Sequence, residues 1–181
     1  MHVKRRKFHK YLGMILDYST VDQLKITILD YIDELMDAFD EAGPMSGFTK
    51  SSTAPSNLLK VDEDCKNLNT KRAVEFHHLV AKILFSTKRV RPDTCTAISF
   101  LTTRVREPDS DNWAKLVYIM KDIRGTRNPP LILSDNGRCI LKWGIDESFE
   151  VHLNMRGQTG GGLSMGRGFP MVSSTKQNLN T

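Results

Sequence analysis

The residues of this sequence that could carry out chemistry are short runs of carboxylates, two adjacent histidines, a glycine-rich stretch and several groups of basic side chains. Asp33 and Glu34 form one acidic run and residues 62–64 form another, and closely spaced carboxylates are ligands that magnesium prefers. Tyr31 and Ile32 lie on the apolar stripe of a helical pattern, so we expect the first run to be a solvated helix face. The second run falls in a segment without periodicity, which favours surface charge over a metal site.

Two further patterns have the composition of a ligand site without its spacing. His77 and His78 are adjacent, and neighbours on a helix diverge by about 100°, so we interpret them as packing or surface histidines. The glycines between 160 and 168 are not followed by the lysine of a phosphate loop and lack its strand–loop–helix context. A tight hairpin is the better interpretation of that stretch.

Cys65, Cys95 and Cys139 are widely spaced and odd in number, so they indicate neither a metal site nor a secreted disulfide framework. No apolar run approaches the roughly 20 residues that cross a bilayer, and the basic start lacks the apolar core of a signal peptide. We therefore expect reduced thiols, no membrane partner and an intracellular location in the cytoplasm or nucleus.

The basic side chains are grouped along the chain. Their excess over 21 acidic residues gives a formal net charge of +5, which permits a polyanionic partner without requiring one. Lysine and arginine in such groups contact phosphates without distinguishing sequence. For any single residue we favour a solvated helix face, and for the later groups together we favour phosphate contacts. The groups are Lys4, Arg5, Arg6, Lys7 and Lys10 at the start, then Lys82, Lys88, Arg89 and Arg91, then Arg104 and Arg106.

Four segments must position these residues. Residues 8–19 alternate imperfectly and predict a strand or short hairpin, and the apolar spacing after Ile28 predicts a helix that Gly43 and the following proline end. The stretch 43–70 has turn formers and no sustained period. It is therefore a long connector, which we expect to dock through Leu58, Leu59 and Val61.

Three helices should follow the connector. The first covers about 71–87, Asp93 can cap the second, and Asp109 or Ser110 can cap the third, which Gly125 suits as an end. Prolines separate them, because a proline disfavours helical geometry in the residue before it. Two short turns make the three helices antiparallel neighbours in a small bundle.

After residues 126–130 the sequence pattern changes to short apolar runs and glycines, which predict strands with tight turns. The sequence thus predicts an α+β fold with a short N-terminal hairpin and helix, a small helical bundle and a final antiparallel sheet. The corresponding segments are 1–48, 49–70, 71–125 and 126–181.

The order of these segments resembles the part of a copia-type retrotransposon polyprotein beyond the reverse transcriptase active site. Residues 76–126, with their Arg-Pro-Asp and Glu-Pro-Asp turns and final Arg-Gly-Thr, resemble its thumb-like helices, which ride on the primer–template backbone. The Tyr-Leu-Gly-Met sequence that starts at Tyr11 resembles the primer grip. The resemblance implies that Tyr11 packs on sugar or base and that Gly13 permits close approach of the backbone. An ordinary amphipathic hairpin is the alternative.

Residues 143–177 resemble the first half of the ribonuclease H domain that closes such polyproteins, so the final sheet is expected to be an incomplete ribonuclease H-like sheet. The resemblance implies that Asp146 occupies the position of one of several carboxylates that hold two Mg²⁺ ions, and one carboxylate cannot hold both. Glu147 points to the opposite strand face, and Glu150 stands where the family has no ligand. The later carboxylates and the polymerase Y-x-D-D box are missing from this sequence.

We therefore expect a remnant of such a polyprotein that is catalytically inert by itself. It should bind RNA, DNA or their hybrid weakly and without sequence preference, and Mg²⁺ is implied by the resemblance rather than by this chain alone. One alternative is a piece of an active RNA-directed DNA polymerase and ribonuclease H, truncated by an incomplete gene model, with a second polyprotein fragment as its partner. Another is a non-functional, poorly folded fragment, because half a sheet leaves an unpaired edge.

Overall fold

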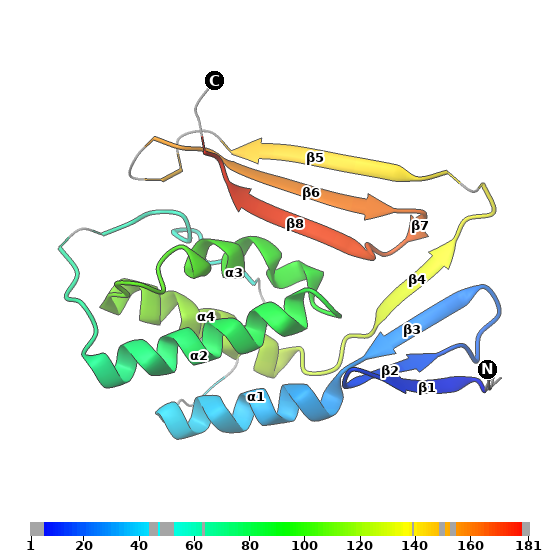
Figure 1. The fold of residues 1–181 in the computed structure, drawn as a ribbon, viewed down its shortest axis with the longest axis horizontal. Coiled ribbons are helices and arrows are strands. Elements are labelled where there is room, and N and C mark those ends of the chain that lie inside the picture. Colours follow the sequence, from blue (N-terminus) through cyan, green and yellow to red (C-terminus); the bar gives the residue numbers. More distant parts are fainter. Residues whose placement is uncertain are drawn as a thin grey trace.

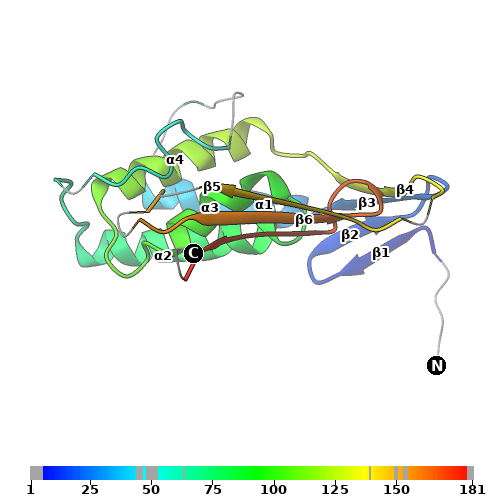
Figure 2. The ribbon, with the colours of Figure 1, turned by 90° about the horizontal axis from the view of Figure 1, so that it is seen from above.

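The computed structural model describes residues 6–43, 47, 53–62, 64–138, 140–148, 151–152 and 155–178. This part of the chain contains four α-helices and eight β-strands in two antiparallel sheets, which confirms the predicted α+β class. The first sheet lies at one end of an elongated molecule, and the second sheet lies across the helices toward the other end (Figures 1 and 2). Some residues named above fall outside the described ranges, namely Lys4, Arg5, Glu63, Cys139 and Glu150.

The N-terminal hairpin consists of β1 (Phe8–Tyr11) and β2 (Met14–Asp17), as predicted. Leu12 and Gly13 join the two strands with φ angles of 48° and 77°. A type I′ loop of two residues needs positive φ at both positions, and glycine adopts such values without the steric cost of a Cβ. A third strand, β3 (Gln23–Thr27), which the sequence pattern does not predict, pairs with β2.

The predicted first helix is α1 (Leu29–Ala42), whose apolar stripe faces the interior. The next helix, α2 (Thr70–Thr87), begins after Asn69, whose side chain accepts a hydrogen bond from the backbone N–H of Arg72 at 2.9 Å. That contact satisfies one of the donors that every helix leaves free in its first turn. The buried stripe of α1 consists of Ile32, Leu35, Met36 and Phe39, which belong to the apolar spacing after Ile28 that predicted this helix.

The other two helices are α3 (Cys95–Thr102), which follows a 3₁₀ turn at Pro92–Thr94, and α4 (Ser110–Gly125). The predicted cap of α4 is confirmed, because Oδ1 of Asp109 accepts a hydrogen bond from the backbone N–H of Asn112 at 2.7 Å. Short connections make α2, α3 and α4 neighbours, as expected for a small bundle.

Two predicted helix ends need correction. Asp93 does not cap α3, since Thr94 is its N-cap residue and makes no side-chain cap hydrogen bond. The carboxylate of Asp93 instead accepts hydrogen bonds from Arg91. Gly125 remains helical, and Thr126 is the C-cap residue of α4.

The hydrophobic core lies between the helices and against the inner face of the first sheet. The connector docks on this core through Leu58, which is 5% exposed, and through the partly buried Leu59 and Val61, as predicted. Among the most deeply buried side chains are Leu35, Phe76, Ile83, Ile98, Phe100, Leu101, Leu116, Ile119, Met120 and Ile123.

The first sheet gains two strands from the last third of the chain. β4 (Leu131–Asp135) pairs with β3, and β7 (Gly166–Arg167) pairs with β4, which gives the strand order β1-β2-β3-β4-β7. Leu131 lies directly opposite Ile26 on the side that faces the core, so the pairing of β3 with β4 buries an apolar row. The predicted segment 126–181 therefore contributes to both sheets.

The second sheet has the order β5-β6-β8, formed by β5 (Lys142–Ser148), β6 (Gln158–Ser164) and β8 (Met171–Lys176). Successive side chains of a strand point to opposite faces. On β8 the buried Ser174 faces the helices, whereas Met171 is 59% exposed and points the other way. One face of the sheet thus rests on the helices while the other is open.

Candidate nucleic-acid interface

The described residues that best suit contact with a polyanion lie where β8 runs beside α3, a line that we call the seam (Figure 1). Val172, Ser174 and Lys176 alternate along β8 on the side that faces α3, and each is less exposed than its neighbours along the strand. The four residue steps from Val172 to Lys176 span about 13 Å, and a duplex carries one phosphate per strand for about every 3.4 Å of its axis. The seam is therefore long enough for several phosphate contacts.

The end of α2 supplies two predicted residues to the first part of the seam. The Nζ atom of Lys88 donates a hydrogen bond to the backbone oxygen of Val172 at 3.0 Å. The guanidinium carbon of Arg89 lies 4.7 Å from the centre of the Phe85 ring, a stacking contact that holds this side chain at the surface. Lys88 is exposed and Arg89 is half-buried, so both cations remain accessible.

Three cations gather at the other end of the seam. The pKa of Lys176 is lowered, first because burial disfavours its charge and then because the Arg156 and Arg104 guanidinium groups repel it. Within the described part of the chain, neither Arg156 nor Lys176 forms an ion pair. Arg104 is partly balanced by Asp109, whose carboxylate lies 3.8 Å away. A bound anion would offset the remaining repulsion.

Arg156 is positioned through His152, which is 6% exposed. The backbone N–H of His152 donates to the backbone oxygen of Arg156 at 3.2 Å. Its ring stacks on Phe100 with 5.9 Å between the ring centres, and its Nε2 donates to the side-chain oxygen of Gln158 at 2.9 Å. The Gln158 amide in turn donates to the hydroxyl of Ser174 on β8 at 2.7 Å. This chain of contacts links Arg156 to β8.

The charge state of His152 follows from the same surroundings. Burial lowers its pKa, the hydrogen bond to Gln158 opposes that shift, and the nearby cations of Lys176 and Arg104 lower it further. His152 is therefore neutral at neutral pH. It positions Arg156 through its backbone hydrogen bond and adds no charge to the seam.

Arg91, a predicted phosphate ligand, has a different role. Its side chain is 2% exposed, and its guanidinium donates to the carboxylate of Asp93 at 2.7–3.1 Å and to the backbone oxygen of Thr126 at 3.0 Å. A further donor reaches the buried carboxylate of Asp122 at 3.4 Å. The prediction that Arg91 contacts nucleic acid is corrected, since its donors are occupied within the fold.

Other predicted residues lie away from the seam. Lys82 lies along α2 where that helix faces α1, in a hollow that it shares with Glu41 and Glu75. Arg106 is exposed in the turn before α4. Tyr11, which is 60% exposed, and Gly13 belong to the β1–β2 hairpin of the first sheet. Of the predicted set, only Lys88, Arg89 and Arg104 come together along the seam.

Asp146 lies on β5 and is exposed, with its Oδ1 accepting a hydrogen bond from the backbone N–H of Glu147 at 2.9 Å. Its cross-strand neighbour is Gly160, and the next residue across is Ser174, so neither offers a carboxylate. Within the described ranges, no three His, Cys, Asp or Glu residues come together as a metal site. These residues do not fit the pair of Mg²⁺ ions that the resemblance implies.

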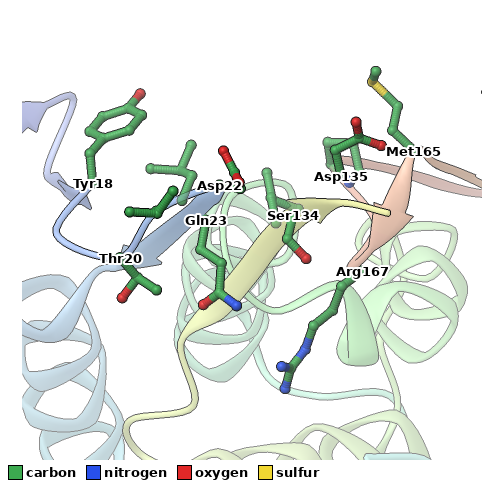
Figure 3. A pocket seen from close by; sticks show the side chains of 12 residues that line it. Tyr18, Thr20, Asp22, Gln23, Ser134, Asp135, Met165 and Arg167 are labelled. Atoms are coloured by element: carbon green, nitrogen blue, oxygen red, sulfur yellow. The ribbon is translucent and has the colours of Figure 1, made fainter. Parts of the chain in front are cut away.

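A separate hollow opens between the ends of β3, β4 and β7 (Figure 3). Its walls are mainly apolar and include Val21, Leu24, Leu133, Met165 and Pro170. Polar side chains, among them Asp22 and Arg167, also line it (Figure 3). A surface of this kind does not suit a phosphate backbone, which needs several cations in line.

Comparison with known proteins adds no assignment. No protein-family model, curated protein or solved structure matches this chain. In the part of the chain that the structure describes, no helix has both the length and the apolar character to cross a bilayer. The link to copia-type polyproteins therefore stays a proposal, and the function proposed for the seam rests on its basic side chains.

The sequence pattern missed Arg156, Lys176 and His152. His152 and Arg156 precede the glycine-rich β6 and Lys176 ends β8, so none of them belongs to a group of basic residues that are close together in the sequence. A usable signal was the alternation of Val172, Ser174 and Lys176, which places the lysine on the same strand face as a buried serine. Their meeting with Arg104 depends on the docking of β8 on α3, which no local pattern predicts.

Proposed function

We propose that this chain binds the phosphate backbone of RNA, DNA or their hybrid along the seam, without distinguishing sequence. The observation that carries the proposal is the group of Arg104, Arg156 and Lys176, in which the two guanidinium groups add to the larger effect of burial in lowering the pKa of Lys176. A phosphate placed among these side chains would remove that repulsion. Lys88 and Arg89 extend the same line of positive charge toward the end of α2.

The contacts available along the seam are of the kind that position a backbone. Lysine and arginine side chains neutralise phosphates and release counterions, so affinity falls as salt concentration rises. Beside Arg104, Arg156 and Lys176, the Phe100 ring is buried against His152 and therefore offers no face on which a base could stack. Sequence-independent binding of modest affinity follows from that composition.

We further propose that the chain is a remnant of a copia-type polyprotein and is catalytically inert by itself. Asp146 lacks the neighbouring carboxylates that a two-metal site requires among the described residues. A second polyprotein fragment that supplied those carboxylates would instead make this chain part of an active nuclease. The exposure of Asp146 on β5 leaves room for such a partner, and a cleavage assay distinguishes the two proposals.

The test compares paired variants in binding to a fluorescent RNA–DNA hybrid. The double variant Arg156→Ala and Lys176→Ala should lose affinity and should reduce the slope of log K against log salt by about 0.7 to 0.9 for each phosphate contact removed. Lys25→Ala is the matched control, because Lys25 is an exposed cation on β3 of the first sheet. Equal salt slopes for the wild type and the double variant would reject the seam as the binding surface.

A further inference from the structure

Strand β5 is an open edge of the second sheet. Among the described strands it pairs only with β6, and all seven of its residues are exposed. It lies along the outer margin of the molecule (Figure 1). Trp143 is 53% exposed and Ile145 is 67% exposed, and both point away from the helices. An exposed edge with apolar side chains is a template for pairing with another strand.

The backbone groups that face the free edge can be identified. In an antiparallel pair, successive residues direct their N–H and C=O groups alternately toward the partner strand and away from it. The backbone N–H of Glu147 donates to the side chain of Asp146, which indicates that Glu147 faces the free edge. By the same alternation, Trp143 and Ile145 also offer their backbone groups to a new strand.

We propose that β5 pairs antiparallel with β5 of a second copy of this chain, centred on Gly144. In that register Trp143 of each copy lies opposite Ile145 of the other, and the two residues exchange the backbone hydrogen bonds that β6 does not use. The same register places Lys142 of each copy opposite Asp146 of the other. Both an apolar pair and a charge pair are thus formed twice about the two-fold axis.

Alternative registers are less complementary. A shift by one residue would place the apolar face of one copy beside the polar face of the other. Centring the pair on Ile145 instead would put Trp143 opposite Glu147 and would leave Lys142 opposite Ser148. Gly144 also suits the axis, because no atom lies within 4 Å of where its Cβ would be and close backbone approach is unobstructed.

The paired strands would form one continuous sheet in the order β8-β6-β5-β5-β6-β8, with the two seams at its outer strands. Trp143 and Ile145 of both copies would gather on the open face and lose exposure to water. The proposal does not rest on nucleic-acid binding, since β6 stands between β5 and the seam. Either proposal can therefore fail without the other.

Charge reversal tests this register by sedimentation velocity over a concentration series. Lys142→Asp and Asp146→Lys each place like charges opposite one another twice, so each variant alone should weaken the dimer by about tenfold or more. An equimolar mixture of the two variants restores two opposite-charge pairs and should dimerise again. The double variant, with both reversals in one chain, should also dimerise like the wild type.

A wild-type chain that stays monomeric up to about 100 µM would overturn the proposal, since specific dimers assemble well below that concentration. It would also be overturned if the mixture stayed monomeric while the wild type dimerised, because another surface would then be responsible. Ile145→Pro is a second test of the same edge, for use if a charge variant misfolds. Its missing N–H lies on the free edge, so it should keep the ladder with β6 and abolish the dimer.

Discussion

The side chain of Lys88 at the end of α2 is hydrogen-bonded to the backbone of Val172 on β8, with 3.0 Å between Nζ and the oxygen. This contact joins residues 84 positions apart and fastens the second sheet to the helical bundle. It also places a cation at one end of the seam whose other end carries Arg104, Arg156 and Lys176. The proposed binding surface therefore exists only while the sheet is docked on the helices.

Replacing Arg91 with Ala should destabilise the fold by about 3 kcal/mol, because it leaves the buried Asp122 without its cation. Burial already raises the pKa of Asp122, and Arg91 opposes that shift. Loss of Arg91 should raise this pKa further, so the folded state takes up a proton more easily at acid pH. The loss of stability should be smaller at pH 5 than at pH 8. Urea unfolding of the wild type and the variant at both pH values measures the loss of stability. An equal loss at pH 5 and pH 8 would contradict the role of the Asp122 carboxylate.

The α4 cap is tested by a pair of variants at Asp109. Asp109→Ala removes the acceptor for the backbone N–H of Asn112 and should cost about 1 kcal/mol. Asp109→Asn keeps a side-chain oxygen at the cap and should retain most of the stability. Thermal unfolding followed by circular dichroism compares the two variants. Equal losses of stability would show that the ion pair between Asp109 and Arg104 matters more than the cap hydrogen bond.

His152 should make the fold sensitive to acid. Its pKa in the folded state is below the ordinary value of 6.5, so the unfolded chain binds the proton first as pH falls. The stability associated with neutral His152 is thus complete above about pH 6.5 and is lost as pH falls toward the folded pKa. The midpoint temperature should drop between pH 7 and pH 5, and His152→Gln should show a smaller drop. An unchanged pH dependence in that variant would rule out His152 as the cause.

Binding should weaken at alkaline pH through Lys176. Because its pKa lies below the ordinary 10.5, Lys176 loses its proton before an exposed lysine does as pH rises. Affinity for a DNA duplex should begin to fall before the pH reaches 10.5, and Lys176→Arg should resist the fall because arginine keeps its charge. The measurement is a salt-matched anisotropy titration in a series of buffers from neutral pH up to 10.5. If the arginine variant loses affinity as steeply as the wild type, Lys176 is not a ligand.

Local patterns predicted the helices well and their surroundings less well. The stripe of α1 and the Asp109 cap depend on residues three or four positions apart, and both were confirmed. Two predictions were wrong for one shared reason. Arg91 was expected at phosphate and Asp93 at a helix cap, but the two side chains bind each other in the turn that joins α2 to α3. A buried guanidinium captures a nearby carboxylate more strongly than a helix terminus does.

Long-range pairing lay beyond the sequence patterns. β4 lies next to β3, although more than 100 residues separate their paired positions, such as Gln23 and Ser134. An apolar run such as Leu-Ile-Leu predicts a strand without naming its partner. The same limit applies to the seam, because Arg104, Arg156 and Lys176 meet only through the docking of β8 on α3. Basic residues that are close together in the sequence could be recognised from it, whereas the basic residues that join them from distant strands and loops could not.

The most direct test of the central claim is one experiment that follows binding and cleavage together. Labelled RNA–DNA hybrid is titrated with the wild-type chain in Mg²⁺ at about 50 mM and about 200 mM salt, a range over which phosphate contacts lose affinity steeply. We predict salt-sensitive binding and an intact hybrid. Salt-insensitive binding would contradict backbone contact, and cleavage that Asp146→Asn abolishes would contradict an inert chain.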